Sequence, residues 1–308
     1  MLQPFLTNHR RLLTCLCVLV GAVWFVLAQG LPTVLGLVVC GVAAYLAAEL
    51  DNAFALVRVS QRTVPALLFM LLAAAPAYHT LSQAHLSVLC SLLVYFPLLA
   101  AYQQPQLTVL PYLAFLALGV NALVASPLLL LSIPLWVAMA MMRSLSLRGW
   151  VATLLGILTP YLWWFALQPY LPPNWGVAPL TWSGWVSAWN GWAWQTGSTA
   201  CYGRGTLLIL LVWLVGLVDI LRTSANDRTR TRIHHYAILL VSAVALALLL
   251  LRPVQAPFFL PWVLSGAAFG GGHFLTLSTG KAAHVIAIIL CVLVLGAACA
   301  ACLLPSDS

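Results

Sequence analysis

Long apolar stretches, broken by short polar connections, follow one another along almost the whole chain. A helix needs about 20 mostly apolar residues to cross the hydrocarbon core of a bilayer. Stretches near that length occur eleven times, which predicts an all-α integral membrane protein with one membrane domain over residues 1–308 and a bundle of ten or eleven transmembrane helices. They cover residues 12–30, 33–50, 63–81, 86–101, 106–123, 126–142, 149–170, 206–222, 235–251, 256–271 and 283–303.

Two of these stretches are weaker than the others. Residues 86–101 form a short stretch that contains Pro97, and residues 256–271 end in the glycine run 270–272. Proline removes one helical hydrogen bond, and glycine has a low helix propensity. Either stretch is therefore open to a second interpretation as a re-entrant or interfacial piece, so ten spans remains an alternative to eleven.

The composition agrees with a surface that faces lipid. Of the 308 residues, 63% are apolar and 6% are charged, whereas a soluble domain carries about a quarter charged residues. The net charge of +8 comes from basic residues that lie between the apolar stretches, where they suit anionic lipid headgroups. We therefore expect membrane lipids as partners and no nucleic acid.

The basic residues also predict an orientation, because cytoplasmic loops carry an excess of Lys and Arg. If Arg10 and Arg11 lie in the cytoplasm, most other arginines fall on the same side, and Arg204 and Arg252 fall outside. This pattern predicts a multi-pass protein of the bacterial inner (cytoplasmic) membrane with a cytoplasmic N-terminus. The further arginines on the predicted cytoplasmic side are Arg58, Arg62, Arg143, Arg148, Arg222, Arg228, Arg230 and Arg232.

The most polar segment of the chain is residues 223–235, which we interpret as a basic cytoplasmic loop. Arg228, Arg230 and Arg232 are candidates for contact with anionic lipid or a protein partner, and the simpler interpretation is a solvated anchor. The neighbouring pair His234-His235 is assigned to the same loop.

A second loop, residues 170–204, is rich in tryptophan and predicted to be extracytoplasmic. Four of its tryptophans have the spacing i, i+3, i+7, i+10, which places them on one face of a helix. We predict an interfacial helix with its indoles at headgroup depth. A structural belt and a platform for a sugar or lipid-carrier headgroup are both compatible with that face, which consists of Trp182, Trp185, Trp189 and Trp192.

Chemistry-bearing side chains are few. Of the five carboxylates, only Asp307 falls on the predicted extracytoplasmic side, and only Asp219 lies within an apolar stretch. Asp219 stands three residues before Arg222, which favours a capping or paired role over a proton relay. His273 follows the glycine run, which indicates close helix packing or a hinge. Zinc-protease, nucleophile-elbow and phosphate-loop motifs are missing, so the catalytic residues, if the chain has any, stay unknown, and we expect no cofactor or metal.

Two stretches carry a resemblance to a known family. Residues 51–69 (DNAFALVRVSQRTVPALLF) and 143–161 (RSLSLRGWVATLLGILTPY) resemble an uncharacterised family of polytopic bacterial inner-membrane proteins, over about residues 45–165. That resemblance implies topology and location only.

A fainter resemblance is to the C-type, lipid-phosphate-sugar-dependent glycosyltransferases. It rests on the Arg-x-x-Pro-x-x-Leu-Phe pattern of residues 62–69 and on the glycine-containing helix, proline-led helix and basic loop of residues 119–148. In that family the catalytic carboxylate lies in the first extracytoplasmic loop, which here is only residues 29–32, Gln-Gly-Leu-Pro. The resemblance therefore implies no catalytic residue.

The sequence favours a non-enzymatic component for transport or envelope assembly. It predicts a broad bundle with proline-containing helices, and it lacks the catalytic motifs named above. Other envelope proteins are its expected partners in the assembly role. The alternative is a membrane glycosyltransferase-like enzyme, active or degenerate, acting on lipid-linked sugars. Whether the chain is an enzyme stays open from the sequence.

Overall fold

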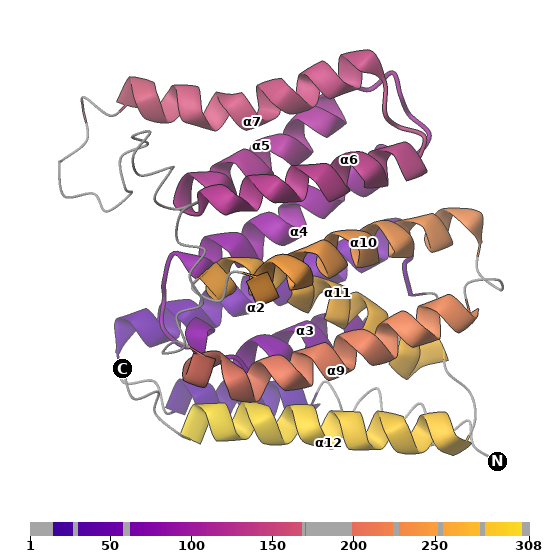
Figure 1. The fold of residues 1–308 in the computed structure, drawn as a ribbon. Coiled ribbons are helices and arrows are strands. Elements are labelled where there is room, and N and C mark those ends of the chain that lie inside the picture. Colours follow the sequence, from indigo (N-terminus) through magenta and orange to yellow (C-terminus); the bar gives the residue numbers. More distant parts are fainter. Residues whose placement is uncertain are drawn as a thin grey trace.

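A computed structural model shows the chain as a bundle of helices (Figure 1). Within the part of the chain that the structure describes, every regular element is a helix and none is a strand. The predicted all-α fold is therefore confirmed. The described residues are 15–26, 30–57, 62–167, 170, 199–223, 228–251, 255–277 and 281–303.

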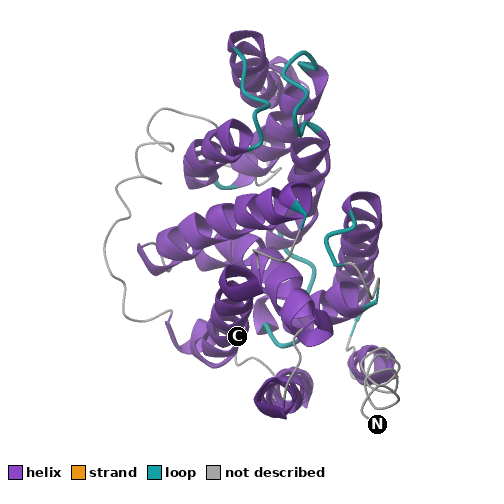
Figure 2. Cartoon of the chain, turned by 90° about the vertical axis from the view of Figure 1, so that its right-hand side faces the viewer, coloured by secondary structure: helices purple, strands orange, loops and turns teal. Residues whose placement is uncertain are grey.

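The helices run roughly along one common direction, with α7 at one edge of the bundle and α12 at the other (Figure 1). A view turned by 90° shows several of them foreshortened, as expected for such an arrangement (Figure 2). A first helix, Cys15–Val26, precedes the labelled ones. These are α2 (Leu31–Phe54), α3 (Thr63–Ala73), η1 (Pro76–Tyr78), α4 (Ala84–Ala100), α5 (Val109–Val124), η2 (Ser126–Leu131), α6 (Ser132–Met141), α7 (Leu147–Leu167), α9 (Thr199–Thr223), α10 (Thr229–Leu251), α11 (Ala256–Leu277) and α12 (Lys281–Leu303).

Each predicted apolar stretch is helical over much of its length. Among the described residues, five helices are long and apolar enough to cross a membrane: α2, α7, the 206–223 part of α9, α10 and α11. This length and composition identify a membrane-type bundle. The predicted Trp-rich interfacial helix, with Trp182, Trp185, Trp189 and Trp192, lies outside the described residues.

The predicted span 63–81 is shorter in the structure. Helix α3 ends at Ala73, and Ala75 adopts an extended conformation before Pro76. The proline ring disfavours helical geometry at the preceding residue, which explains this end. The chain then makes the short helix η1, where the Tyr78 hydroxyl donates a hydrogen bond of 2.8 Å to the carbonyl oxygen of Pro257 at the start of α11.

Helix α11 forms the centre of the bundle, packed against α3, α4, α9 and α10. Residues 259–274 are all buried. The glycines of α11 allow this close packing, because a Cβ at Gly271 would lie 2.8 Å from side-chain atoms of both Leu67 in α3 and Val212 in α9. The stretch that looks weakest as a helix is therefore the innermost one.

The described charged residues gather toward one end of the bundle. At that end α2, α4, α6, α9 and α11 end and α3, α5, α7, α10 and α12 begin (Figure 1). We call this the arginine end. The described acids, Glu49, Asp51 and Asp219, lie toward the same end, in the last turns of α2 and α9. The arginines with described side chains all lie here: Arg62, Arg143, Arg148, Arg222, Arg228, Arg230 and Arg232.

Candidate functional site

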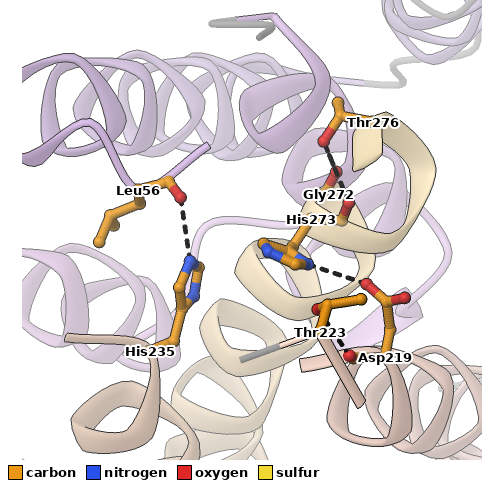
Figure 3. Close-up of polar contacts among 7 residues, drawn as sticks. All are labelled: Leu56, Asp219, Thr223, His235, Gly272, His273 and Thr276. Carbon is orange, nitrogen blue, oxygen red and sulfur yellow. Dashed lines mark hydrogen bonds and ion pairs between the residues drawn. The ribbon is translucent and has the colours of Figure 1, made fainter. Parts of the chain in front are cut away.

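A carboxylate and an imidazole from two different helices meet in the bundle interior near the arginine end (Figure 3). Asp219 of α9 and His273 of α11 approach to 2.8 Å between Oδ2 and Nδ1. His273 is 1% exposed and Asp219 is 9% exposed. At this distance Nδ1–H donates a hydrogen bond to the carboxylate, so the acid fixes both the tautomer and the orientation of the ring.

A close contact between α9 and α11 explains why this pair can form. The two helices both run toward the arginine end, and Gly216 lies three residues before Asp219 just as Gly270 lies three residues before His273. Gly216 packs directly on Gly270, because a Cβ at Gly216 would be 2.5 Å from the carbonyl carbon of Gly270. The backbones are thus close enough, one turn earlier, to bring the two side chains into hydrogen-bonding contact.

His235 of α10 extends this polar group (Figure 3). Its ring lies edge-on to that of His273, with 5.1 Å between centroids and an interplanar angle of 76°. Its Nε2 is 3.0 Å from the carbonyl oxygen of Leu56, so Nε2–H is the donor. A file of groups therefore runs from the turn after α2, through His235 and His273, to Asp219, and we call it the Asp219–His273–His235 file.

The Asp219–His273 pair places an ionisable carboxylate and an imidazole in the bundle interior. A carboxylate beside a neutral imidazole carries one net negative charge, whereas the same pair with one added proton is neutral overall. Burial makes an uncompensated charge costly, and the hydrogen bond between the two groups offsets part of that cost. Two imidazoles and a carboxylate in contact are also the groups from which membrane proton relays are built.

These positions correct two expectations. His234 and His235 do not belong to a loop, because α10 begins at Thr229 and places both in its second turn, fully buried. The basic segment is thus partly helical, with Thr231 and both histidines turned inward. Asp219 pairs with His273 in place of the expected capping or Arg222 pairing, because it lies on the side of α9 that packs on α11, while Arg222 is exposed.

His234 points away from the file, toward α2 and α4. Its ring packs edge-on against Phe54 at 5.7 Å and against Tyr102 at 5.4 Å between centroids. The guanidinium of Arg230 lies 5.8 Å from the centroid of the same Tyr102 ring. Of the three arginines predicted to contact lipid or a partner, Arg228 and Arg230 are exposed and Arg232 is partly exposed, so they remain candidates for that role.

Two further histidines lie at the opposite end of the bundle. His79 Nε2 is 2.8 Å from the carbonyl oxygen of Ala73, and His85 Nε2 is 3.2 Å from that of Tyr78. Burial lowers the pKa of His79, and its hydrogen bond to Ala73 opposes that effect. Both rings are held by the backbone, and no cluster of three metal-ligating side chains is found among the described residues.

No protein-family model matches the chain, and no curated protein or solved structure matches it either. Function is therefore inferred from the geometry of the described residues.

Proposed function

We propose that this chain is a multi-pass protein of the bacterial cytoplasmic membrane that transports a small solute, coupled to proton binding at the Asp219–His273–His235 file. The observation that supports this proposal is the hydrogen-bonded pair of Asp219 and His273 in the interior of a membrane-type bundle. Ionisable groups in such a place are costly, and they typically mark ion or substrate pathways.

The packing around the file supports a transport role. The pair joins α9 to α11, and the ring of His235 brings α10 into the same group. A change in the number of bound protons therefore acts on three helices at once. The contact of Gly216 with Gly270 is formed by small residues, and such surfaces allow neighbouring helices to approach closely and to shift by small amounts.

The enzyme alternative has less support from the structure. An enzyme acting on lipid-linked sugars at the extracytoplasmic face would need a carboxylate there as base or metal ligand. The acids in the described ranges, Glu49, Asp51 and Asp219, all lie toward the arginine end, which we propose to be cytoplasmic.

Solute-dependent proton movement tests the proposed function. The purified chain is reconstituted in liposomes that contain a pH-sensitive dye, with a more acidic buffer outside. Polyols, neutral sugars, amino acids and small organic anions are then added one at a time. We expect at least one solute to acidify the lumen faster than in protein-free liposomes. If the folded, inserted chain gives no solute-dependent acidification, the proposal is wrong.

The proposed orientation leads to a separate prediction about two glutamines. Gln106, in the exposed connection between α4 and α5, lies at the arginine end, and Gln83, before α4, lies at the opposite end. In spheroplasts, an impermeant maleimide is expected to label Gln83→Cys at once and Gln106→Cys only after permeabilisation. The background is a chain whose native cysteines are replaced. The reverse labelling pattern would contradict a cytoplasmic arginine end.

A further inference from the structure

We infer that Asp51 is a positioning residue for the Asp219–His273–His235 file, an inference that rests on the proposed transport function. The carboxylate of Asp51 holds the turn after α2 in shape, and that turn fixes the ring of His235 through the carbonyl group of Leu56. Two buried hydrogen bonds in series connect the carboxylate to the ring.

The first of these bonds holds the turn. Asp51 lies in the last turn of α2 and is 1% exposed. Its Oδ1 accepts a hydrogen bond of 2.8 Å from the backbone N–H of Val57. Between them, Ala55 adopts a left-handed conformation with φ 48° and ψ 48°. Glycine or asparagine usually occupies such a position, because a Cβ atom makes this conformation costly. The hydrogen bond to Asp51 therefore stabilises a turn that its own sequence disfavours.

The second bond determines how His235 is held. The carbonyl oxygen of Leu56 lies 3.0 Å from His235 Nε2 and accepts its hydrogen bond (Figure 3). A neutral imidazole carries one N–H, so this bond selects the tautomer with the hydrogen on Nε2. It also orients the ring edge-on to His273, at 5.1 Å between centroids. Leu56 and Val57 are both buried, so water does not readily replace either hydrogen bond.

A ring contact places the end of α2 beside α10 independently of Asp51. Phe54 packs edge-on against His234, the neighbour of His235, at 5.7 Å between centroids. If the hydrogen bond to Val57 is lost, this contact still keeps the two helices together. The expected change is therefore confined to the direction of the Leu56 carbonyl group.

Three local costs meet at this turn, which indicates a role beyond ending a helix. A carboxylate is costly to bury, and Asp51 Oδ2 has no hydrogen-bond partner among the described residues. An acid in the last turn also lies near the negative end of the helix dipole. The third cost is the left-handed alanine at position 55. Local rules of this kind are typically broken at functional sites.

Removing the carboxylate is expected to release His235. The N–H of Val57 would become a buried donor without an acceptor, so the turn should rearrange to pair it. Leu56 belongs to the same turn, and its carbonyl would move away from His235 Nε2. One lost hydrogen bond changes an equilibrium constant about tenfold. The ratio of the two neutral tautomers of His235 should shift by that factor toward the form with the hydrogen on Nδ1.

NMR of the full chain in nanodiscs, with isotope-labelled histidine, measures this ratio. Comparison with His235→Gln identifies the His235 signal among the seven histidines. Asp51→Leu removes the acceptor and is expected to shift the ratio about tenfold. Asp51→Asn keeps an oxygen that can accept from Val57 N–H, so it is expected to keep the wild-type ratio. Asn52→Leu, at the exposed next position, is the matched control and should not change the ratio.

Transport measurements add a readout that a purely structural role would not give. In liposomes, with the solute that is active for the wild type, Asp51→Leu is expected to slow solute-driven acidification about tenfold. Solute exchange without a pH gradient should continue at the wild-type rate, because only the proton-binding file is disturbed. A general loss of structure would slow both processes together.

The outcomes separate this inference from the proposed function. The inference is overturned if Asp51→Leu keeps the wild-type tautomer ratio, if acidification persists despite a shifted ratio, or if acidification and exchange are lost alike. Asp51→Ala repeats the test without added bulk. If neither variant folds, Asp51 is required for folding and the inference is overturned as well. If the wild type shows no solute-dependent acidification, the proposed function is wrong, and a shifted ratio still identifies Asp51 as the residue that positions His235.

Discussion

Asp219→Asn is expected to reduce solute-driven acidification of proteoliposomes to the level of protein-free liposomes. Asparagine has the shape of aspartate, and its Oδ1 can still accept the hydrogen bond from His273 Nδ1 at 2.8 Å. The amide carries no negative charge, so a proton on His273 would leave an uncompensated positive charge in the bundle interior, and proton binding becomes costly while the packing is kept. Initial rates from the entrapped dye, measured with the solute that is active for the wild type, provide the test.

Glu49→Gln is the matched control for this substitution. Glu49 lies near the end of α2, at the same end of the bundle, and is hydrogen-bonded to Tyr45 one turn earlier on the outer side of that helix. Removing the carboxylate at this position is expected to leave the rate of solute-driven acidification unchanged. Solute exchange without a pH gradient should persist in Asp219→Asn, because exchange requires no net change in the number of bound protons. If Asp219→Asn acidifies the liposomes at the same rate as the wild type, the Asp219 carboxylate is not the coupling group.

The helical content could be predicted because it depends on local composition alone. Stretches of about 20 apolar residues must form helices in lipid, since no water is available for an exposed backbone. The structure has helices at the predicted positions, including α4, which continues through Pro97. The proline lies near the end of that helix, where one missing hydrogen bond changes little.

The importance of α11 could not be predicted in the same way. Its glycine run lowers helix propensity, so the sequence pattern alone suggested a weak span. In the bundle the same glycines are required, because Gly272 packs on Val64 and Gly270 on Gly216. Tertiary packing overrides local propensity, and a single sequence does not show which neighbour will face each glycine.

The candidate site was missed for a related reason. His235 is next to a basic segment, which favoured a loop, and Asp219 is close to Arg222, which favoured a local pair. Residues 219 and 273 are far apart in the sequence and meet because α9 and α11 lie parallel in contact. The available signal was that Asp219 and His273 each follow a glycine by three residues, on two apolar helices.

That spacing leads to a prediction about stability. Gly216→Val is expected to lower the unfolding midpoint of the purified protein by several degrees and to abolish solute-driven acidification. A Cβ at position 216 would lie 2.5 Å from the carbonyl carbon of Gly270 and 2.7 Å from the nitrogen of Gly271. These are backbone atoms, which cannot rotate away, so α9 and α11 must separate. Overpacking of this kind costs about 1–3 kcal/mol.

Gly41→Val on α2 separates this effect from the general cost of valine in a helix. Position 41 is exposed, and a Cβ there would have no neighbouring atom within 4 Å. In detergent, the midpoint of thermal unfolding should therefore fall clearly for Gly216→Val and change little for Gly41→Val. If both variants melt at the wild-type temperature, the close contact of α9 with α11 is wrong. Because Asp219 and His273 lie one turn beyond that contact, separating the helices also lengthens their hydrogen bond, so stability and proton coupling should be lost together.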